Sequence, residues 1–365
     1  MASDSTAGAA ARPKGTGLFA PGANRIAFAL LLLVAVAAPY IVSEYWLRAI
    51  FIPTLIFGLA ALGLNMVTGY AGLISMGQAA FMAVGAFTAV IAYGKFGVPI
   101  PLALLLAGCL AATIGVAFGT PSLRIRGLYL MVATLAAQFI IIWILQRVPW
   151  TGSGSFATIN TPPVRIGGWA ATTTADHYYL VLIVVAAMTA FGRNLVGSHI
   201  GRAWMALRDH ETAAAVMGVS MLRYKLLAFL VSSFYAGVAG GLVVFGWTGA
   251  ASVQEYELDV SIKILGMIIV GGLGSVMGSF LGAAFIMLLP ILIGLGMHHV
   301  AALVGRSVAS VDILANAEHI VFGSLVLFFL IKEPHGLARL WQRLTDWIDA
   351  KFSTGKTRVR SEDPK

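Results

Sequence analysis

The chain carries little charge and almost no cysteine. Of its 365 residues, 59% are hydrophobic and only 11% are charged. Soluble globular proteins carry about 25% charged residues, so this chain lacks the polar surface that a soluble fold needs. Its single cysteine, Cys109, excludes an intrachain disulfide. These shortages indicate an all-α, polytopic membrane protein.

Long apolar runs are what the chain has instead. Many approach the ~20 residues that cross a hydrocarbon core, and we predict about ten transmembrane helices. They cover residues 26–43, 50–67, 79–95, 100–120, 127–146, 178–196, 225–247, 260–275, 277–296 and 319–332.

The basic residues set the orientation. The net charge of +9 would suggest nucleic acid in a soluble protein, but here it is loop charge, and we expect no nucleic-acid partner. With the N-terminus inside, 18 of the 24 basic residues fall on the inner side. This bias predicts that both termini are cytoplasmic. The run at 26–43 contains a small-residue pattern that resembles a signal-peptide cleavage site, but we interpret it as an uncleaved anchor helix.

The sequence also predicts where the membrane domain begins and ends and what flanks it. We expect residues 1–25 to be a disordered cytoplasmic N-terminus, residues 26–335 to form the transmembrane domain, and residues 353–365 to form a disordered tail. Residues 336–352 place Trp341, Leu344 and Ile348 at helical spacing, which predicts an amphipathic helix against membrane lipid. The Gly/Thr/Pro-rich stretch 148–177 is either a docking surface or a connecting loop.

Few polar side chains lie within the predicted spans, and none is a carboxylate near the middle of a segment. Proton-coupled carriers usually place an ionisable residue there, so its absence disfavours that class. Lys263 is paired by spacing with Asp259. Candidates to line a translocation path are the following four residues, for which interhelical hydrogen bonding is the alternative: Asn65, Ser75, Gln78 and Gln138.

Two glycine-rich turns interrupt the apolar pattern at 68–81 and 271–282, and both fall near the inner face. Gly72-Leu-Ile-Ser75 partly echoes Gly272-Leu-Gly-Ser275, so an internal repeat is possible. Interrupted segments at matching positions of two halves point to a transport pathway. Close helix packing through small residues is the alternative.

Motifs of enzymes and metal sites are missing. Gly355-Lys-Thr357 resembles the end of a phosphate-binding loop, but Ala350 stands where that pattern requires glycine. The pair His298-His299 has no carboxylate or thiol at metal-ligand spacing. We therefore expect no catalytic residue, no metal and no cofactor.

A polar, basic insert separates two long apolar runs between Arg193 and Lys225. It is too polar for a bilayer, yet its apolar spacing suits a short helix outside one. A charged helical loop of this kind on the cytoplasmic side of a membrane protein usually holds a partner.

The insert, from Gly201 to Gly218, resembles the cytoplasmic coupling loop of ABC importer permeases, and more narrowly the branched-chain amino acid permease family. Three further stretches resemble that family in order: Leu62 to Gln78, Arg126 to Leu130 and Gly271 to Ser275. The resemblance covers roughly residues 50–335. Where the family's first turn has histidine this chain has Gln78, which cannot titrate.

The resemblance implies a transport subunit without its own nucleotide-binding site. Its expected partners are two ATP-binding subunits, a second homologous permease in a heterodimer and a periplasmic or extracellular substrate-binding protein, at a bacterial inner membrane. The coupling loop, about 198–222, is then expected to dock on the ATPase. Its implied contact residues are Arg202, Arg208, Glu211, Ala213, Ala214 and Gly218.

The resemblance leaves the substrate open. Branched-chain or related amino acids are the first hypothesis, with urea, short amides or aromatic acids carried by the same class of importer as the second. A self-contained secondary carrier or channel is a competing class, against which the partner loop and the missing carboxylates argue.

Overall fold

In a computed structural model of the protein, the residues described are 36, 38–40, 42–122, 128–148, 158–166, 169–171, 173–304, 311–332 and 336–338. Contacts divide the chain into residues 39–342, which carry every helix and strand named below, and the two chain ends. The predicted N-terminal segment 1–25, most of the first apolar run, most of the interfacial helix 336–352 and the tail 353–365 lie outside the described residues.

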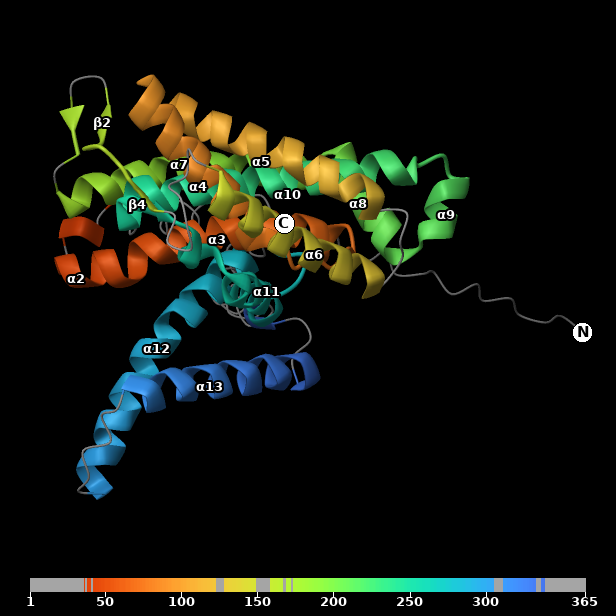
Figure 1. Ribbon diagram of the computed structural model, residues 1–365. Coiled ribbons are helices and arrows are strands. Elements are labelled where there is room, and N and C mark those ends of the chain that lie inside the picture. Colours follow the sequence, from red (N-terminus) through yellow and green to blue (C-terminus); the bar gives the residue numbers. More distant parts are fainter. Residues whose placement is uncertain are drawn as a thin grey trace, which may run out of the picture. The chain divides into compact units, whose positions relative to one another are not determined.

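The described chain is almost entirely helical (Figure 1). A continuous first helix is built from α2 (Glu44–Trp46), a π-helical turn at Leu47–Phe51, α3 (Ile52–Asn65) and a second π-helical turn at Met66–Tyr70. Four long helices follow: α4 (Gln78–Phe96), α5 (Ile100–Ser122), α6 (Leu128–Arg147) and α7 (Thr174–Gly197).

Two short helices, α8 (His199–Asp209) and α9 (Glu211–Val216), connect α7 to the next long helix, α10 (Met221–Val243), which continues as a π-helical turn at Val244–Thr248. The last helices are α11 (Leu258–Gly271), α12 (Val276–Val304) and α13 (Val311–Lys332).

Within the described residues, seven helices are long and apolar enough to cross a membrane. They correspond to seven of the ten predicted segments, so the prediction of an all-α polytopic membrane protein is confirmed. Of the other three segments, 26–43 lies mostly outside the described residues, and the apolar part of α13 is short, at Ile320–Phe329. The third, α11, has 14 residues and therefore rises about 21 Å, less than the ~30 Å of a hydrocarbon core.

The helical core is packed through small residues. α10 lies against α4 and α5 and also contacts α3. A β-carbon added to Gly240 of α10 would lie 1.9 Å from the carbonyl oxygen of Met82 in α4. One added to Gly85 of α4 would lie 2.1 Å from the carbonyl oxygen of Gly237. The backbones therefore approach as closely as glycine allows, which is how membrane helices gain packing energy without a hydrophobic driving force.

Short strands cover the end of the long helices opposite α8 and α9 (Figure 1). β1 (Thr158–Asn160) pairs with β4 (Ala250–Ser252) in antiparallel fashion, and β2 (Arg165–Ile166) pairs with β3 (Trp169–Ala170). Within the predicted loop 148–177, β1 therefore pairs with the segment that follows α10, β2 and β3 pair with each other, and α7 already begins at Thr174. The predicted pair of Asp259 and Lys263 is also confirmed, with 3.9 Å between Oδ2 and Nζ.

Candidate coupling loop, glycine turns and far-end pocket

The coupling loop begins with a tight corner at which α8 folds back on α7. The Ser198 hydroxyl accepts a hydrogen bond from the Ile200 amide at 3.1 Å and so caps α8. Trp204 is fully buried, and its indole N–H donates to the Tyr224 carbonyl at 2.8 Å. This bond fastens α8 to the first turn of α10. The loop is thus held to both of the long helices that it connects.

The next helix, α9, presents small and apolar side chains to solvent. Ala213 is exposed, whereas its neighbour Ala214 is buried. At the end of α9, the side chains of Val216 and Met217 are 87% and 84% exposed. Gly218 ends the helix with a φ of +87°, and a β-carbon there would meet nothing within 4 Å. Neighbouring apolar side chains this exposed in a polar loop indicate a contact surface.

Two charged residues predicted in this loop contact other groups of the protein, Glu211 in a partly buried ion pair and Arg202 at an exposed backbone carbonyl. The Glu211 carboxylate forms an ion pair with the ammonium group of Lys225 in α10, and the two side chains are only 32% and 12% exposed. Arg202 reaches the Gly197 carbonyl at 3.3 Å. The ion pair joins α9 to α10, and breaking it would leave the lysine charge poorly solvated.

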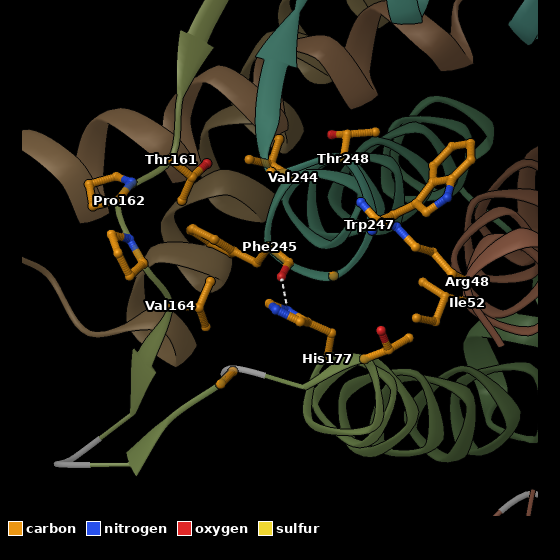
Figure 2. A pocket seen from close by; sticks show the side chains of 15 residues that line it. Arg48, Ile52, Thr161, Pro162, Val164, His177, Val244, Phe245, Trp247 and Thr248 are labelled. Carbon is orange, nitrogen blue, oxygen red and sulfur yellow. Dashed lines mark hydrogen bonds between the residues drawn. The ribbon is translucent and has the colours of Figure 1, made fainter. Parts of the chain in front are cut away.

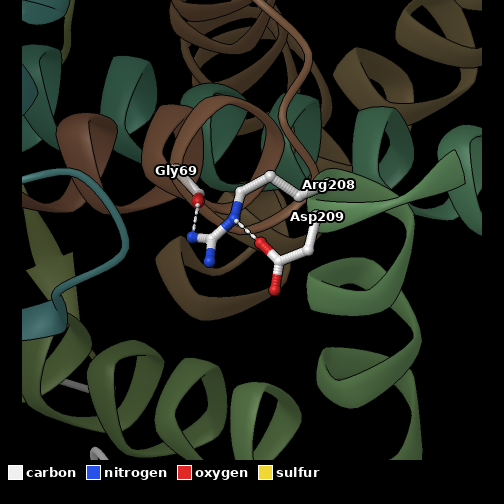
Figure 3. Close-up of polar contacts among 3 residues, drawn as sticks. All are labelled: Gly69, Arg208 and Asp209. Carbon is white, nitrogen blue, oxygen red and sulfur yellow. Dashed lines mark hydrogen bonds and ion pairs between the residues drawn. The ribbon is translucent and has the colours of Figure 1, made fainter.

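Arg208 connects the coupling loop to the first glycine turn (Figure 3). Its Nη1 donates to the Gly69 carbonyl at 2.8 Å, and its Nε lies 3.0 Å from the Asp209 carboxylate. Gly72 has a φ of +71°, and a β-carbon there would lie 2.8 Å from the Arg208 side chain. A β-carbon on Gly274 of the second turn would lie 3.4 Å from Nη1 of the same guanidinium. Both turns therefore lie at the α8 end of the helices.

Asn65 joins the two interrupted segments. Its Nδ2 donates to the Ser275 carbonyl and to the Ser279 hydroxyl, each at 2.9 Å. Its Oδ1 accepts from the Gly274 amide at 2.8 Å. The predicted echo between the two glycine motifs thus corresponds to two turns that are hydrogen-bonded to each other through one buried amide. The predicted end of the eighth segment at residue 275 was wrong, because Gly272 has a φ of +118° that no helix allows.

The remaining candidate path residues surround the first turn of α4. Gln78 donates to the Ala60 carbonyl at 3.0 Å and accepts from the Ser232 hydroxyl at 3.3 Å. Gln138 accepts from the Ala80 amide at 2.8 Å and donates to the Tyr256 carbonyl at 2.9 Å. Ser75 is buried in the extended segment that leads into α4. Side chains of other helices thus satisfy amides that begin α4.

At the opposite end of α7 and α10 lies a cavity of about 290 Å³ (Figure 2). Its apolar wall includes Ile52, Val244, Phe245 and Trp247. The Nδ1 atom of His177, in the first turns of α7, lies 2.9 Å from the Phe245 carbonyl oxygen. The lining residues come from the first helix, the β1–β2 segment, α7 and the end of α10, so sequence patterns within one segment gave no signal for this cavity.

The electrostatics of this end are mixed. Arg48 is the cation that lines the cavity. Glu255 lies beyond the strand β4, and burial raises the pKa of its carboxyl, although a hydrogen bond with Thr248 acts in the opposite direction. Across the described residues, no group of three or more His, Cys, Asp or Glu side chains is arranged to hold a metal ion.

Comparison with known proteins places the chain in a family. Residues 46–330 match the family described as branched-chain amino acid transport system, permease component. The chain is 32% identical over 279 residues to the high-affinity branched-chain amino acid transport system permease protein LivM of Salmonella typhimurium, and this match covers 70% of the chain and 65% of that protein. It is 31% identical over 276 residues to LivM of Escherichia coli, with 69% and 64% covered.

A more distant relative, the probable branched-chain amino acid transport permease protein LivM of Methanocaldococcus jannaschii, is 22% identical over 241 residues, which are 65% of the chain and 67% of that protein. The chain spans just under two thirds of the length of the two bacterial relatives. No solved structure is significantly similar to it. Because the family match spans residues 46–330, the chain belongs to the family of permease components of branched-chain amino acid transport systems.

Proposed function

We propose that this chain is the membrane-spanning permease subunit of an ATP-driven importer, in a bacterial inner membrane, that translocates branched-chain or related amino acids. The observation that carries the proposal is the coupling loop. It is fastened to α10 through Trp204, yet it presents the apolar tip formed by Val216 and Met217 to solvent. A loop that is rigidly held and apolar at its tip is suited to receive force from a partner.

In this proposal the energy comes from separate ATP-binding subunits, and the chain itself is not an enzyme. The exposed face of α9, with Ala213 and the end at Gly218, docks in a groove of the ATPase. Small residues there let the backbone of α9 approach the partner closely. The buried Ala214 lies on the opposite face, toward the permease.

Two polar connections then carry the movement of α9 into the membrane. The Glu211–Lys225 ion pair transmits it to α10, and the bond from Arg208 to the Gly69 carbonyl transmits it to the first glycine turn. Because Asn65 ties that turn to Gly274 and Ser275, both interrupted segments respond together. Arg202 contributes positive charge to the exposed side of α8, where an acidic ATPase surface would fit.

The path itself is proposed to run beside the two glycine turns. Backbone that leaves a helix at membrane depth is tolerated only where protein or a water-filled cavity satisfies it. Asn65, Ser75, Gln78 and Gln138 surround such backbone, and they are our candidates for the border of the path. The complete importer would add a second homologous permease and a substrate-binding protein, as the resemblance to the family implies.

Purification of the tagged chain in mild detergent tests this function. We expect an ATPase and a second permease to accompany it in stoichiometric amounts, and we expect uptake of leucine into liposomes to require ATP. A lone chain that transports without ATP would contradict the proposal and identify a carrier or channel. ATP-dependent uptake of urea or short amides in preference to leucine would keep the importer class but replace the substrate.

A further inference from the structure

The cavity at the far end of α7 and α10 has the composition of a ligand site. Its volume of about 290 Å³ lies near the lower limit of the roughly 300–1,000 Å³ typical of small-molecule pockets. An amino acid fits this size, and a large cofactor does not. Its lining is divided about evenly between polar and apolar surface, which suits a small amphipathic molecule.

Arg48 gives the cavity its charge preference. No Asp or Glu is among the lining residues of the described chain, and within the described chain Arg48 has no ion-pair partner. Glu44, one helical turn earlier, accepts a hydrogen bond from the Thr174 hydroxyl at 2.5 Å instead. The planar guanidinium is matched to a carboxylate, which it can bind through two parallel hydrogen bonds.

His177 supplies a hydrogen-bond acceptor, whereas Arg48 supplies donors. The Phe245 carbonyl can only accept, so the Nδ1 atom that lies 2.9 Å from its oxygen carries the proton. In the neutral ring, Nε2 is then an acceptor. A cavity that holds an acceptor, an arginine and apolar side chains is complementary to a molecule that carries an ammonium group, a carboxylate and an aliphatic side chain.

We propose that this pocket is a binding site for a free α-amino acid with an aliphatic side chain. Arg48 binds its carboxylate, Nε2 of His177 accepts from its ammonium group, and Ile52, Val244 and Trp247 surround its side chain. The inference adds a binding site to the proposed function, and it rests on that function for the direction of transport.

The position of the pocket links it to the coupling loop. Thr174 and His177 begin α7, and Val244 to Thr248 end α10, while the coupling loop joins the other ends of the same two helices. With 24 residues, α7 places its ends about 36 Å apart. The bond between His177 and Phe245 fixes the two helices to each other at the pocket. A shift of one helix along the other would break this bond and open the wall of the site.

Photo-crosslinking tests the proposal. A diazirine analogue of leucine, which keeps both charged groups, is irradiated with the nucleotide-free complex in nanodiscs, and the labelled peptides are identified by mass spectrometry. We expect labels in the segments that line the pocket. Leucine should compete well, 4-methylvalerate (no ammonium) less well, and isopentylamine (no carboxylate) hardly at all.

Arg48→Gln should weaken the competition by leucine about tenfold to hundredfold, because a charge-assisted hydrogen bond is lost. Arg48→Lys should restore part of it. Arg165→Gln, which removes the same charge from the exposed β2 without touching the cavity, is the matched control and should bind leucine as the wild type does. Unchanged melting temperatures exclude a folding defect.

Three outcomes would overturn the site. In the first, isopentylamine competes as well as leucine, and in the second the label falls outside the lining segments. In the third, only the binding protein, and not leucine, prevents labelling of the pocket, which would identify a protein-docking surface. If the site fails while ATP-driven uptake persists, the proposed function stands. If leucine protects the pocket but uptake needs no ATP, the proposed function fails and the site remains.

Discussion

The two ends of α7 and α10 are held by different kinds of interaction. At the coupling-loop end the contacts are charged side chains that cross between elements, such as Glu211 with Lys225. At the far end they are a strand pair and the bond from His177 to the Phe245 carbonyl. Between the ends, Tyr235 is fully buried in α10 and donates to the Met188 carbonyl of α7 at 2.7 Å.

This difference suggests how the molecule divides its tasks. The middle of the helices is close-packed and deforms little, so the helices move as rods. The ends are joined by a small number of polar contacts, each of which can break and re-form. In the proposed function, a small movement of α9 would therefore reach the far end without disturbing the core.

The largest effect is expected in the packed middle. Gly240→Val puts side-chain carbon into the Met82 backbone, which no rotamer change can relieve. We expect a loss of about 3 kcal/mol or more, or failure to fold, measured as thermal unfolding in detergent. Gly294→Val, at a helical glycine with open space around it, is the control and should melt near the wild type. Equal stability of the two variants would show that the middle is not rigid.

Asn65→Ala is expected to be the next most damaging. It removes two buried hydrogen bonds and one part-buried one, and it leaves the Gly274 amide without its partner, at a cost of about 1–3 kcal/mol. If Asn65 also borders the path, relative uptake rates of leucine, isoleucine and valine should change. Thr113→Ala, which removes only an exposed bond within α5, should change neither. An equal loss of uptake for all three amino acids would assign Asn65 to packing alone.

Much of this framework follows from the sequence, and the reason is the strength of apolar periodicity. The segment predicted at 225–247 is α10 with its π-turn, Met221–Thr248, and the i,i+4 spacing of Asp259 and Lys263 gave their ion pair. Local patterns did not predict contacts between distant segments. The pairing of β1 with β4 and the reach of Arg208 to Gly69 depend on how the helices pack, which no local pattern records.

Arg208→Ala should have a smaller effect on stability and a larger one on coupling. The guanidinium is partly exposed, so the fold tolerates its loss, but the link from α8 to the first glycine turn disappears. We expect ATP hydrolysis by the complex to respond several-fold less to substrate-loaded binding protein. Arg208→Lys, which can still reach the carbonyl, should recover part of the response. Arg223→Ala removes a nearby exposed charge and serves as the control. A wild-type response of the Ala variant would contradict the link.

The smallest effect is expected for the exposed pair on α11. Asp259→Asn breaks an ion pair whose atoms lie 3.9 Å apart and whose side chains are solvated. Pairs of this kind contribute about 0.3–0.5 kcal/mol, so the melting temperature should hardly change, and at high salt the change should be smaller still. A loss of stability as large as that caused by Asn65→Ala would mean that this ion pair holds the far end more firmly than its geometry indicates.

The most direct test of the account is the number of ATP molecules hydrolysed per amino acid taken up by the reconstituted complex. A side chain at Gly218 is strained by the positive φ but has open space around it at the surface of the loop, so Gly218→Trp should leave the membrane core folded while blocking a close approach to the ATPase. Hydrolysis per molecule transported should rise severalfold as uptake falls. An unchanged ratio with full uptake would show that α9 does not couple the ATPase to the permease.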